Sequence, residues 1–167
     1  SCSTKGMLAT TRGFSLAHIT SLPQSHSSSA VFLNSPIQQG LANHNPDVDA
    51  IWRLTHAFPP CIDFNKVLSI ALGTDVWCPF NSQSTWWWPE AYPLMYLPSY
   101  CSFRMTDIWR SFIAQRCLWE LGYGVVFHAA EVVQERNEHD LMRDFADEVD
   151  GYLRNKEMAK ILAALTL

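Results

Sequence analysis

The amino-acid sequence predicts an α/β fold. Three segments carry this prediction: a strand pattern over residues 66–74, an amphipathic helix over residues 102–124 and a short apolar strand over residues 125–129. The order strand, loop, helix, strand indicates a sheet with a helix packed on it. Of the 167 residues, 48% are hydrophobic, so the chain is long enough for one domain with its own core.

The first part of the chain is expected to be loop. Residues 1–40 are rich in serine and turn formers and show little periodicity, apart from a short strand at residues 30–33. Residues 43–55 begin as a turn, in which Asp47 is expected to cap a short helical turn. Asp47 and Asp49 also form a D-x-D pattern of the kind associated with metal-bound sugar nucleotides, and a capped, solvated turn is the alternative.

The predicted strand at residues 66–74 has two fairly apolar faces, which is typical of a buried strand, and Gly73 ends it. Residues 76–98 then contain four prolines and three consecutive tryptophans, Trp86, Trp87 and Trp88. Long loops inside compact domains are usually functional or disordered, and consecutive tryptophans argue against disorder. We therefore expect a structured loop with one short extended piece.

The clearest helix pattern lies at residues 102–124, where apolar side chains recur on one face. Ser102 or Thr106 is the expected N-cap, and Gly122 is the expected stop. Asp107 lies in the first turn, where the helix dipole favours a carboxylate. The residues of the predicted apolar face are Met105, Ile108, Trp109, Phe112 and Ile113, extended by Cys117 and Leu121.

The C-terminal part is expected to hold two helices. Apolar residues recur every four positions after residue 140, with Asn137 as the cap and Gly151 as the stop. Residues 155–167 form a final amphipathic helix of strong helix formers. We thus divide the chain into a Ser-rich arm (1–40), an α/β region (41–154) and this last helix (155–167).

Composition excludes several classes of protein. A net charge of −4 provides no basic stripe for nucleic acid, and no run of about 18 apolar residues could span a membrane. The chain opens without Met and without a signal pattern, and we interpret it as a piece of a longer protein. The five cysteines include no CxxC pair, so zinc is not expected; one disulfide in an oxidising lumen is the alternative to buried thiols.

Two residues are the main candidates for chemistry. Asp107 is either a helix-capping carboxylate or a general base, because ligand groups in open α/β sheets gather where helices begin. His128 ends the predicted strand, and it is either a core histidine bonded to a carbonyl or a metal ligand. The sequence contains no glycine-rich nucleotide loop and no G-x-S-x-G elbow.

Long runs within residues 43–154, among them FNSQSTWWWPEAYPLMYLPSYCSFRMTDIW and VVFHAAEVVQERNEHDLMRDF, resemble the STELLO family of Golgi proteins, which are described as probable glycosyltransferases. The words PDVDA, GTDVWCPFNSQSTWW, FRMTDIW and VVFH are also similar, in type and order, to words of the UDP-arabinopyranose mutases. These resemblances imply the C-terminal, acceptor-side portion of a GT-A-like fold, with a mixed sheet, flanking helices and a missing nucleotide-binding half.

By the same resemblance, Asp107 is the catalytic carboxylate and His128 the metal ligand. Substrate binding is assigned to Asn81, Arg104 and the three tryptophans. The sequence departs from the mutases at two points. Where the mutases have two adjacent acidic residues, this chain has the single acid Asp107. No glycine precedes Asn81 on the loop. Asp47 and Asp49 match a late turn of the mutases, so they are assigned only as turn carboxylates.

The resemblance implies transfer of a sugar from a nucleotide sugar to a glycan or protein acceptor, with Mn²⁺ or Mg²⁺, in the lumen of the Golgi or secretory pathway. Membrane enzymes are the implied protein partners. Two alternatives remain open. One is a non-catalytic, degenerate transferase fold that binds partner proteins through its aromatic loop. The other is a structural domain without a ligand.

Overall fold

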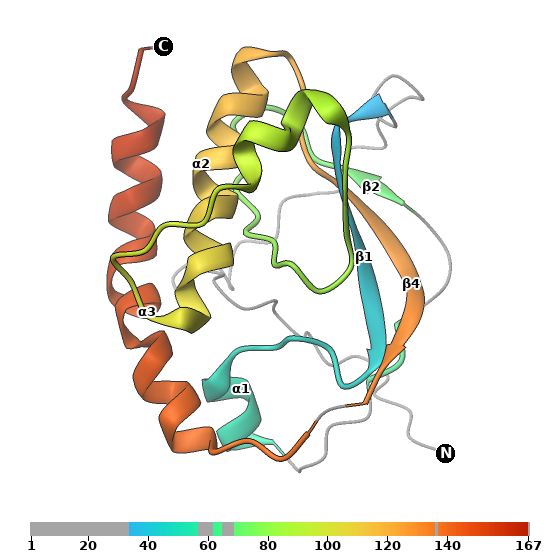
Figure 1. Ribbon diagram of the computed structural model, residues 1–167, viewed down its shortest axis with the longest axis vertical. Coiled ribbons are helices and arrows are strands. Elements are labelled where there is room, and N and C mark those ends of the chain that lie inside the picture. The colour runs from blue at the N-terminus through green and yellow to red at the C-terminus, as the bar shows by residue number, and fades with distance from the viewer. Residues whose placement is uncertain (1–33, 57–61, 65–68, 136, 167) are drawn as a thin grey trace.

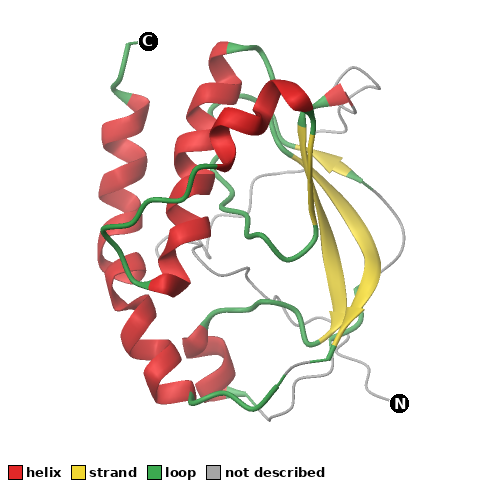
Figure 2. Ribbon diagram, in the orientation of Figure 1, coloured by secondary structure: helices red, strands yellow, loops and turns green. Residues whose placement is uncertain are grey.

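The computed structural model describes residues 34–56, 62–64, 69–135 and 137–166. Over this part the protein is an α/β structure with three layers (Figure 1). A twisted sheet forms one layer, helix α2 (Thr106–Glu120) lies against it, and helix α3 (Leu141–Ala163) lies outside α2. All the helices lie on one face of the sheet (Figure 2). The predicted fold class is confirmed.

The sheet is mixed and has four strands in the order β2, β4, β1, β3. Its centre is the parallel pair β1 (Ile37–His44) and β4 (Val126–Gln134). The short strands β3 (Thr85–Trp87) and β2 (Ile70–Ala71) pair antiparallel at its two edges. The β1–β4 register shifts on either side of Leu41, so β4 contains extra residues and bends there.

The sequence placed three strands imperfectly. The predicted arm ends at residue 40, yet β1 begins at Ile37, so the boundary falls inside the central strand. Residues 1–33, with the predicted strand at 30–33, lie outside the described part. The predicted buried strand at 66–74 is described only as the two-residue edge strand β2, with Ile70 exposed. The strand predicted to end near residue 129 continues to Gln134.

The loop of residues 76–98 is structured, as predicted, and contains β3 as its extended piece. It also contains a 3₁₀ segment, η3 (Pro89–Met95). This segment was not predicted, because prolines within a run argue against a helix. A second 3₁₀ segment, η4 (Phe103–Met105), leads into α2. Neither predicted N-cap donates or accepts a capping bond: Met105 occupies the cap position of α2. Gly122 ends the helix with a φ of 76°, as predicted.

Helix α3 corrects two predictions. It runs without a break through Gly151, so the predicted helix at 155–167 is the second half of one long helix, and Asp140 caps it instead of Asn137. Gly151 is required for packing: a Cβ there would lie 2.6 Å from Cε of the buried Met105. Within the described part, no helix combines the length and apolar character needed to cross a membrane.

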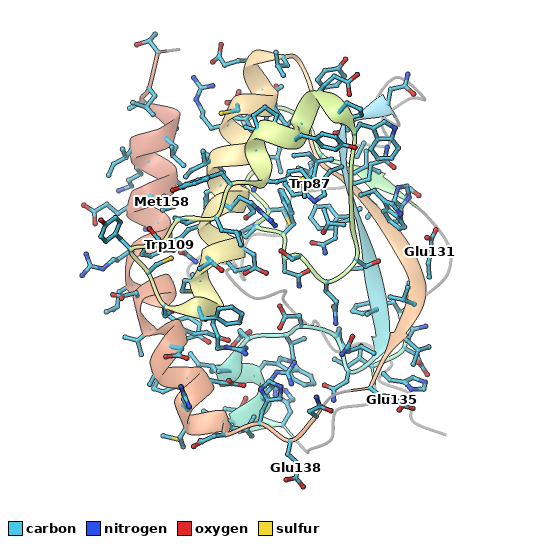
Figure 3. The ribbon with its side chains drawn as sticks, in the orientation of Figure 1. Trp87, Trp109, Glu131, Glu135, Glu138 and Met158 are labelled. Carbon is cyan, nitrogen blue, oxygen red and sulfur yellow. The ribbon has the colours of Figure 1, made fainter. Side chains whose placement is uncertain are left out.

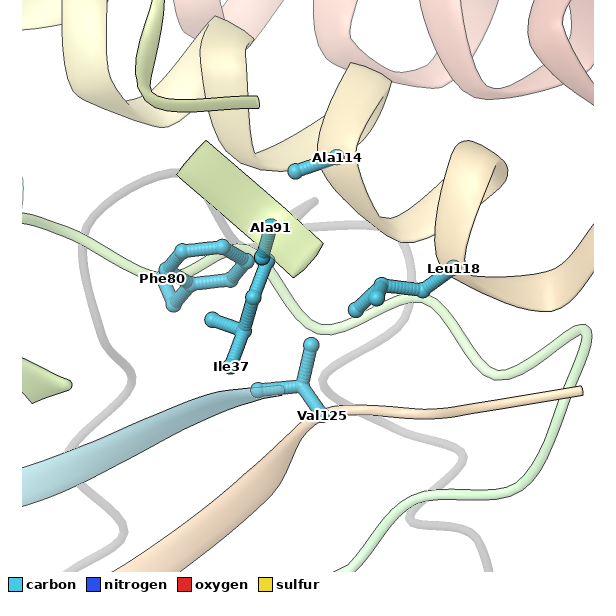
Figure 4. Close-up of a cluster of buried hydrophobic side chains, with 6 residues drawn as sticks. All are labelled: Ile37, Phe80, Ala91, Ala114, Leu118 and Val125. Carbon is cyan, nitrogen blue, oxygen red and sulfur yellow. The ribbon is translucent and has the colours of Figure 1, made fainter. Parts of the chain in front are cut away.

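Two apolar clusters hold the layers together. One, between the sheet and α2, consists of buried side chains from the strands, the loop and the helix (Figure 4): Ile37, Phe80, Ala91, Ala114, Leu118 and Val125. The other joins α2 to α3 and includes Trp109 and Met158 (Figure 3). Because α2 is covered on both sides, its polar Ser111 and Gln115 are also buried. Ile113, predicted on the apolar face, is 43% exposed.

A buried carboxylate ties α3 to α1 (Ala50–Thr55) and to η4, the segment that leads into α2. Glu148 of α3 is 1% exposed and accepts hydrogen bonds from Arg104 at 2.6 and 2.8 Å. Its other oxygen accepts from the backbone N–H of Ala50, the first residue of α1, at 2.8 Å, and from the Tyr152 hydroxyl at 2.7 Å. A helix start leaves N–H groups unpaired, and here a neighbouring helix satisfies one of them.

We expect Glu148→Gln to lower the free energy of unfolding by about 3 kcal/mol, because it leaves the buried Arg104 guanidinium without its main carboxylate. The measurement is urea denaturation at neutral pH. Asp150→Asn is the control, since Asp150 pairs with Arg154 on the exposed face of α3 and should cost under about 0.5 kcal/mol. Equal losses in the two variants would contradict this role for Glu148.

Candidate functional site

The loop that follows β2 approaches the inner face of the sheet at Asn81. The side chain of Gln39 on β1 holds it there: its Oε1 accepts from the Asn81 backbone N–H at 3.0 Å, and its Nε2 donates to Asn81 Oδ1 at 2.7 Å. Both side chains are buried. A loop has no neighbouring strand to form hydrogen bonds with its backbone. The buried Gln39 side chain therefore accepts the hydrogen bond of the Asn81 N–H.

The side-chain amide of Asn81 also binds Asp47, one of the two predicted turn carboxylates. Asn81 Nδ2 donates to Asp47 Oδ2 at 3.0 Å, and both residues are more than nine-tenths buried. A small pocket, about 20 Å³ in volume, lies beside them, between the loop and β1. Its polar lining comes from Gln39, Asp47, Asn81 and Gln83, and its apolar lining from Leu41, Ala42, Pro46, Val48 and Phe64. The structure thus brings Asn81 and Asp47 together.

Asp107 reaches the same loop from the first turn of α2. Its Oδ2 accepts from the backbone N–H of Ser82 at 3.1 Å, and the carboxylate is half-buried. Ser82 lies between Asn81 and Gln83, two of the residues that line the pocket. Asp107 therefore braces the pocket loop from the side opposite Gln39. A half-exposed carboxylate in this position can accept a proton from a ligand hydroxyl.

Arg110 lies one turn further along α2 and is 5% exposed. Its guanidinium stacks over Trp87, 4.8 Å from the ring centre, and donates from Nη2 to Ser82 Oγ at 3.2 Å. Its Nε is buried without a hydrogen-bond partner in the described structure. Burial lowers the pKa of Arg110, and the charge of Asp107 counteracts this. Sequence analysis missed Arg110, Ser82 and Gln39; no spacing pattern distinguishes them.

The three tryptophans do not form one platform. Side chains alternate across a strand, so Trp87 points inward while Trp86 and Trp88 point to the other face. Trp87 packs on the core cluster beneath Arg110 (Figure 3), and the other two are 40% and 44% exposed. Trp87 is thus partly buried against the core, and of the three tryptophans only Trp86 and Trp88 are exposed.

His128 lies on the outer face of the sheet, away from Asp107. It is the third residue of β4, not the last, and its ring is held edge-on to Trp86 with the ring centres 5.7 Å apart. Nδ1 bonds to Ser69 Oγ and Nε2 to Gln38 Oε1, each at 2.6 Å. The sheet therefore separates His128 and Trp86 from Asp107 and Asn81, and the candidate residues do not all lie at one pocket.

The surroundings of His128 do not fit a metal. Both ring nitrogens already have hydrogen-bond partners, and within the described ranges no three His, Cys, Asp or Glu side chains gather as ligands. Asp49 is also occupied structurally, because it caps α1 by accepting from Trp52 N–H at 3.0 Å; it takes the capping role predicted for Asp47. Arg104 is engaged by Glu148 and Asp144 of α3 and lies outside the site.

A family model described as STELLO glycosyltransferases matches residues 104–165, which include Asp107 and Arg110. The chain is 33% identical over 132 residues to "Probable glycosyltransferase STELLO2" of Arabidopsis thaliana, which covers 77% of this chain and 17% of that protein. It is 36% identical to "Probable glycosyltransferase STELLO1" of the same plant, over 52% of this chain and 12% of the relative. The chain spans less than a fifth of these curated relatives.

The loop before Asn81 is held from α2 as well. Gln115 Oε1 accepts from the Cys78 backbone N–H at 2.9 Å, and burial raises the pKa of the Cys78 thiol from 9.0 to about 12. A folded-state pKa above the unfolded value means that this thiol contributes stability below about pH 9, which is lost as the pH rises toward 12. Cys78, Cys101 and Cys117 are unbridged thiols, and Cys2 and Cys61 lie outside the described residues.

We expect native Cys78 to resist iodoacetamide at about pH 8, since the thiolate is the reactive form. Gln115→Ala should raise its alkylation rate roughly tenfold, because losing one buried hydrogen bond of about 1.5 kcal/mol increases the open population of the loop. Peptide mapping gives the rate at each cysteine.

Gln134→Ala, at an exposed end of β4, is the matched control. Cys117 on α2, which is also partly buried, is the reference thiol in the same sample. Equal acceleration at Cys78 and Cys117 would show that Gln115 stabilises the whole fold and not the loop.

Proposed function

Because this chain belongs to the STELLO family of glycosyltransferases, we propose that it forms the acceptor side of a glycosyltransferase that uses a nucleotide sugar. The proposal adopts a GT-A-like arrangement, in which other parts of the protein bind the nucleotide. It places the activity in the lumen of the Golgi or secretory pathway, with a glycan or protein as acceptor.

One observation carries the proposal: the Asp107 carboxylate is fixed against the backbone of the loop whose neighbouring residues line the pocket. In the transfer step, an acceptor hydroxyl attacks the anomeric carbon of the donor sugar. Its proton passes to Asp107, and the bond from the sugar to the nucleoside diphosphate breaks. Asn81 holds the loop and Asp47 the pocket edge, so these residues position the acceptor and do not react.

Arg110 supports Asp107 in this role. Its guanidinium donates to Ser82, the residue whose backbone N–H bonds to the Asp107 carboxylate, so both side chains hold the same position of the loop. The stacked Trp87 and Phe80 rings hold that guanidinium rigidly, at 4.8 and 5.8 Å from their centres. A divalent cation remains part of the proposal, with its ligands outside the residues that the structure describes, so no step here depends on it.

A second candidate function rests on exposed aromatic side chains. Tyr96, Tyr100 and Phe103, between η3 and α2, are 78%, 101% and 88% exposed. Exposed apolar groups in one segment are typical of protein-binding surfaces. This observation favours a partner-binding module. Trp87 is partly buried and packs against the core cluster, so these three exposed residues are the ones to substitute in an association assay.

The test uses the full-length protein that carries this sequence. Asp107→Asn retains an oxygen that can accept from Ser82 N–H but loses the base. We expect kcat for sugar transfer to fall about 100-fold or more, since general-base catalysis contributes 10²–10⁴-fold. The melting temperature should stay unchanged. Transfer is measured with UDP-sugars and Mn²⁺, with Asp150→Asn as the exposed control.

Two results would overturn the proposal in different ways. Unchanged transfer by Asp107→Asn would remove Asp107 from the chemistry. Absence of both transfer and thermal stabilisation by any UDP-sugar in the wild-type protein would remove the enzyme function. Loss of partner association in Tyr100→Ser, with no transfer detected, would then favour the binding module.

A further inference from the structure

The outer face of the sheet carries a second cluster of polar side chains that the proposed transferase site does not use. Gln38 of β1, Trp86 of β3, His128 of β4 and Ser69, which precedes β2, meet there. No helix of the described part covers this face (Figures 1 and 2). Ser69 is exposed and His128 partly buried, so a small molecule can reach both.

The direction of every hydrogen bond in this cluster follows from one carboxamide. Gln38 Nε2 donates to the Ser35 carbonyl at 3.1 Å, so Gln38 Oε1 faces His128. That oxygen can only accept, and the proton of the 2.6 Å bond therefore lies on His128 Nε2. We assign Nδ1 as the acceptor of the other bond, to which the Ser69 hydroxyl donates at 2.6 Å.

The ring is also held in place by its neighbours. Trp86 lies edge-on to it, and Trp86 and Gln38 are direct partners in the β1–β3 register. Gly40 leaves room for the indole: a Cβ there would lie 3.1 Å from the Trp86 ring. The imidazole is thus oriented by a hydrogen bond on one side and an aromatic ring on another. Nucleophile, base and orienting group in hydrogen-bonded series are the signature of an activated nucleophile.

We propose that Ser69 is a nucleophile that accepts acyl groups from esters, with His128 as its general base and Gln38 as a positioning residue. Ser69 Oγ attacks the ester carbonyl carbon, and its proton moves to His128 Nδ1. The carbon–oxygen bond to the alcohol then breaks, and the imidazolium returns the proton to the departing alcohol. The products are acyl-Ser69 and the free alcohol. The exposed face of Trp86 receives the apolar part of the ester.

The test uses the full chain and p-nitrophenyl acetate, with release of p-nitrophenol and acetylation mapped by mass spectrometry. We expect Ser69 to be acetylated about 100-fold faster than Ser99, an exposed serine in the same chain, given the usual contribution of a general base. Ser69→Ala should abolish the fast release, and His128→Gln should reduce it to the rate of Ser99. Similar rates at the two serines would overturn the proposal.

Gln38 has its own readout. The nitrogen chemical shifts of His128 should report the Nε2–H tautomer, and an Nδ1–H tautomer would overturn the mechanism. Gln38→Leu should lose that tautomer preference and slow the acetylation of Ser69, whereas Gln38→Glu, which keeps an acceptor, should restore both. A circular dichroism melt of each variant confirms that it is folded. Loss of rate in both Gln38 variants would refute the positioning role.

Discussion

Glu148 is the contact on which the arrangement of helices and loops depends. Through one buried carboxylate it fixes the start of α1, the segment that leads into α2, and Tyr152 on its own helix. Burial and the bond to Glu148 both raise the pKa of the Tyr152 hydroxyl, which keeps it protonated as a donor. The start of α1 adjoins Asp47, and the start of α2 carries Asp107. A residue outside the pocket therefore positions both Asp47, which lines the pocket, and Asp107, which holds the pocket loop.

The site is built from polar side chains inside the core, which is costly unless each is paired. Gln39 and Gln115 meet that condition by satisfying the backbone of the irregular loop from two sides. Arg110 does not, because its Nε has no partner in the described structure. Buried polar atoms without a partner are common at functional sites, where side chains are selected for binding a ligand and not only for stabilising the fold. It supports the choice of this face for the transferase chemistry.

Periodicity in the sequence was sufficient for the fold class and for α2, because those features depend on local pattern. Periodicity failed where contacts between residues far apart in the sequence determine where an element begins or ends. Gly151 has the character of a helix stop, but it lies within α3 because Met105 needs the space. His128 was placed at a strand end, while the irregular pairing of β4 with β1 carries that strand further. Asp107 and Asn81 were both assigned to the site from the family resemblance; their separation from His128 follows from side-chain alternation across the sheet, which requires the register.

The parallel pairing of β1 with β4 has a consequence for how the chain folds. The two central strands are neighbours in space, yet more than 80 residues separate Ile37 from Val126. During synthesis, β1 leaves the ribosome long before β4 exists, and among the described residues only the three-residue β3 and the isolated bridge at Ile62 can pair with it in the meantime. Contacts of such long sequence separation slow folding, because the entropy of closing the loop is lost before the sheet forms. The nascent chain therefore exposes an unpaired strand edge until residue 134 has emerged, and protection by chaperones matters most in that interval.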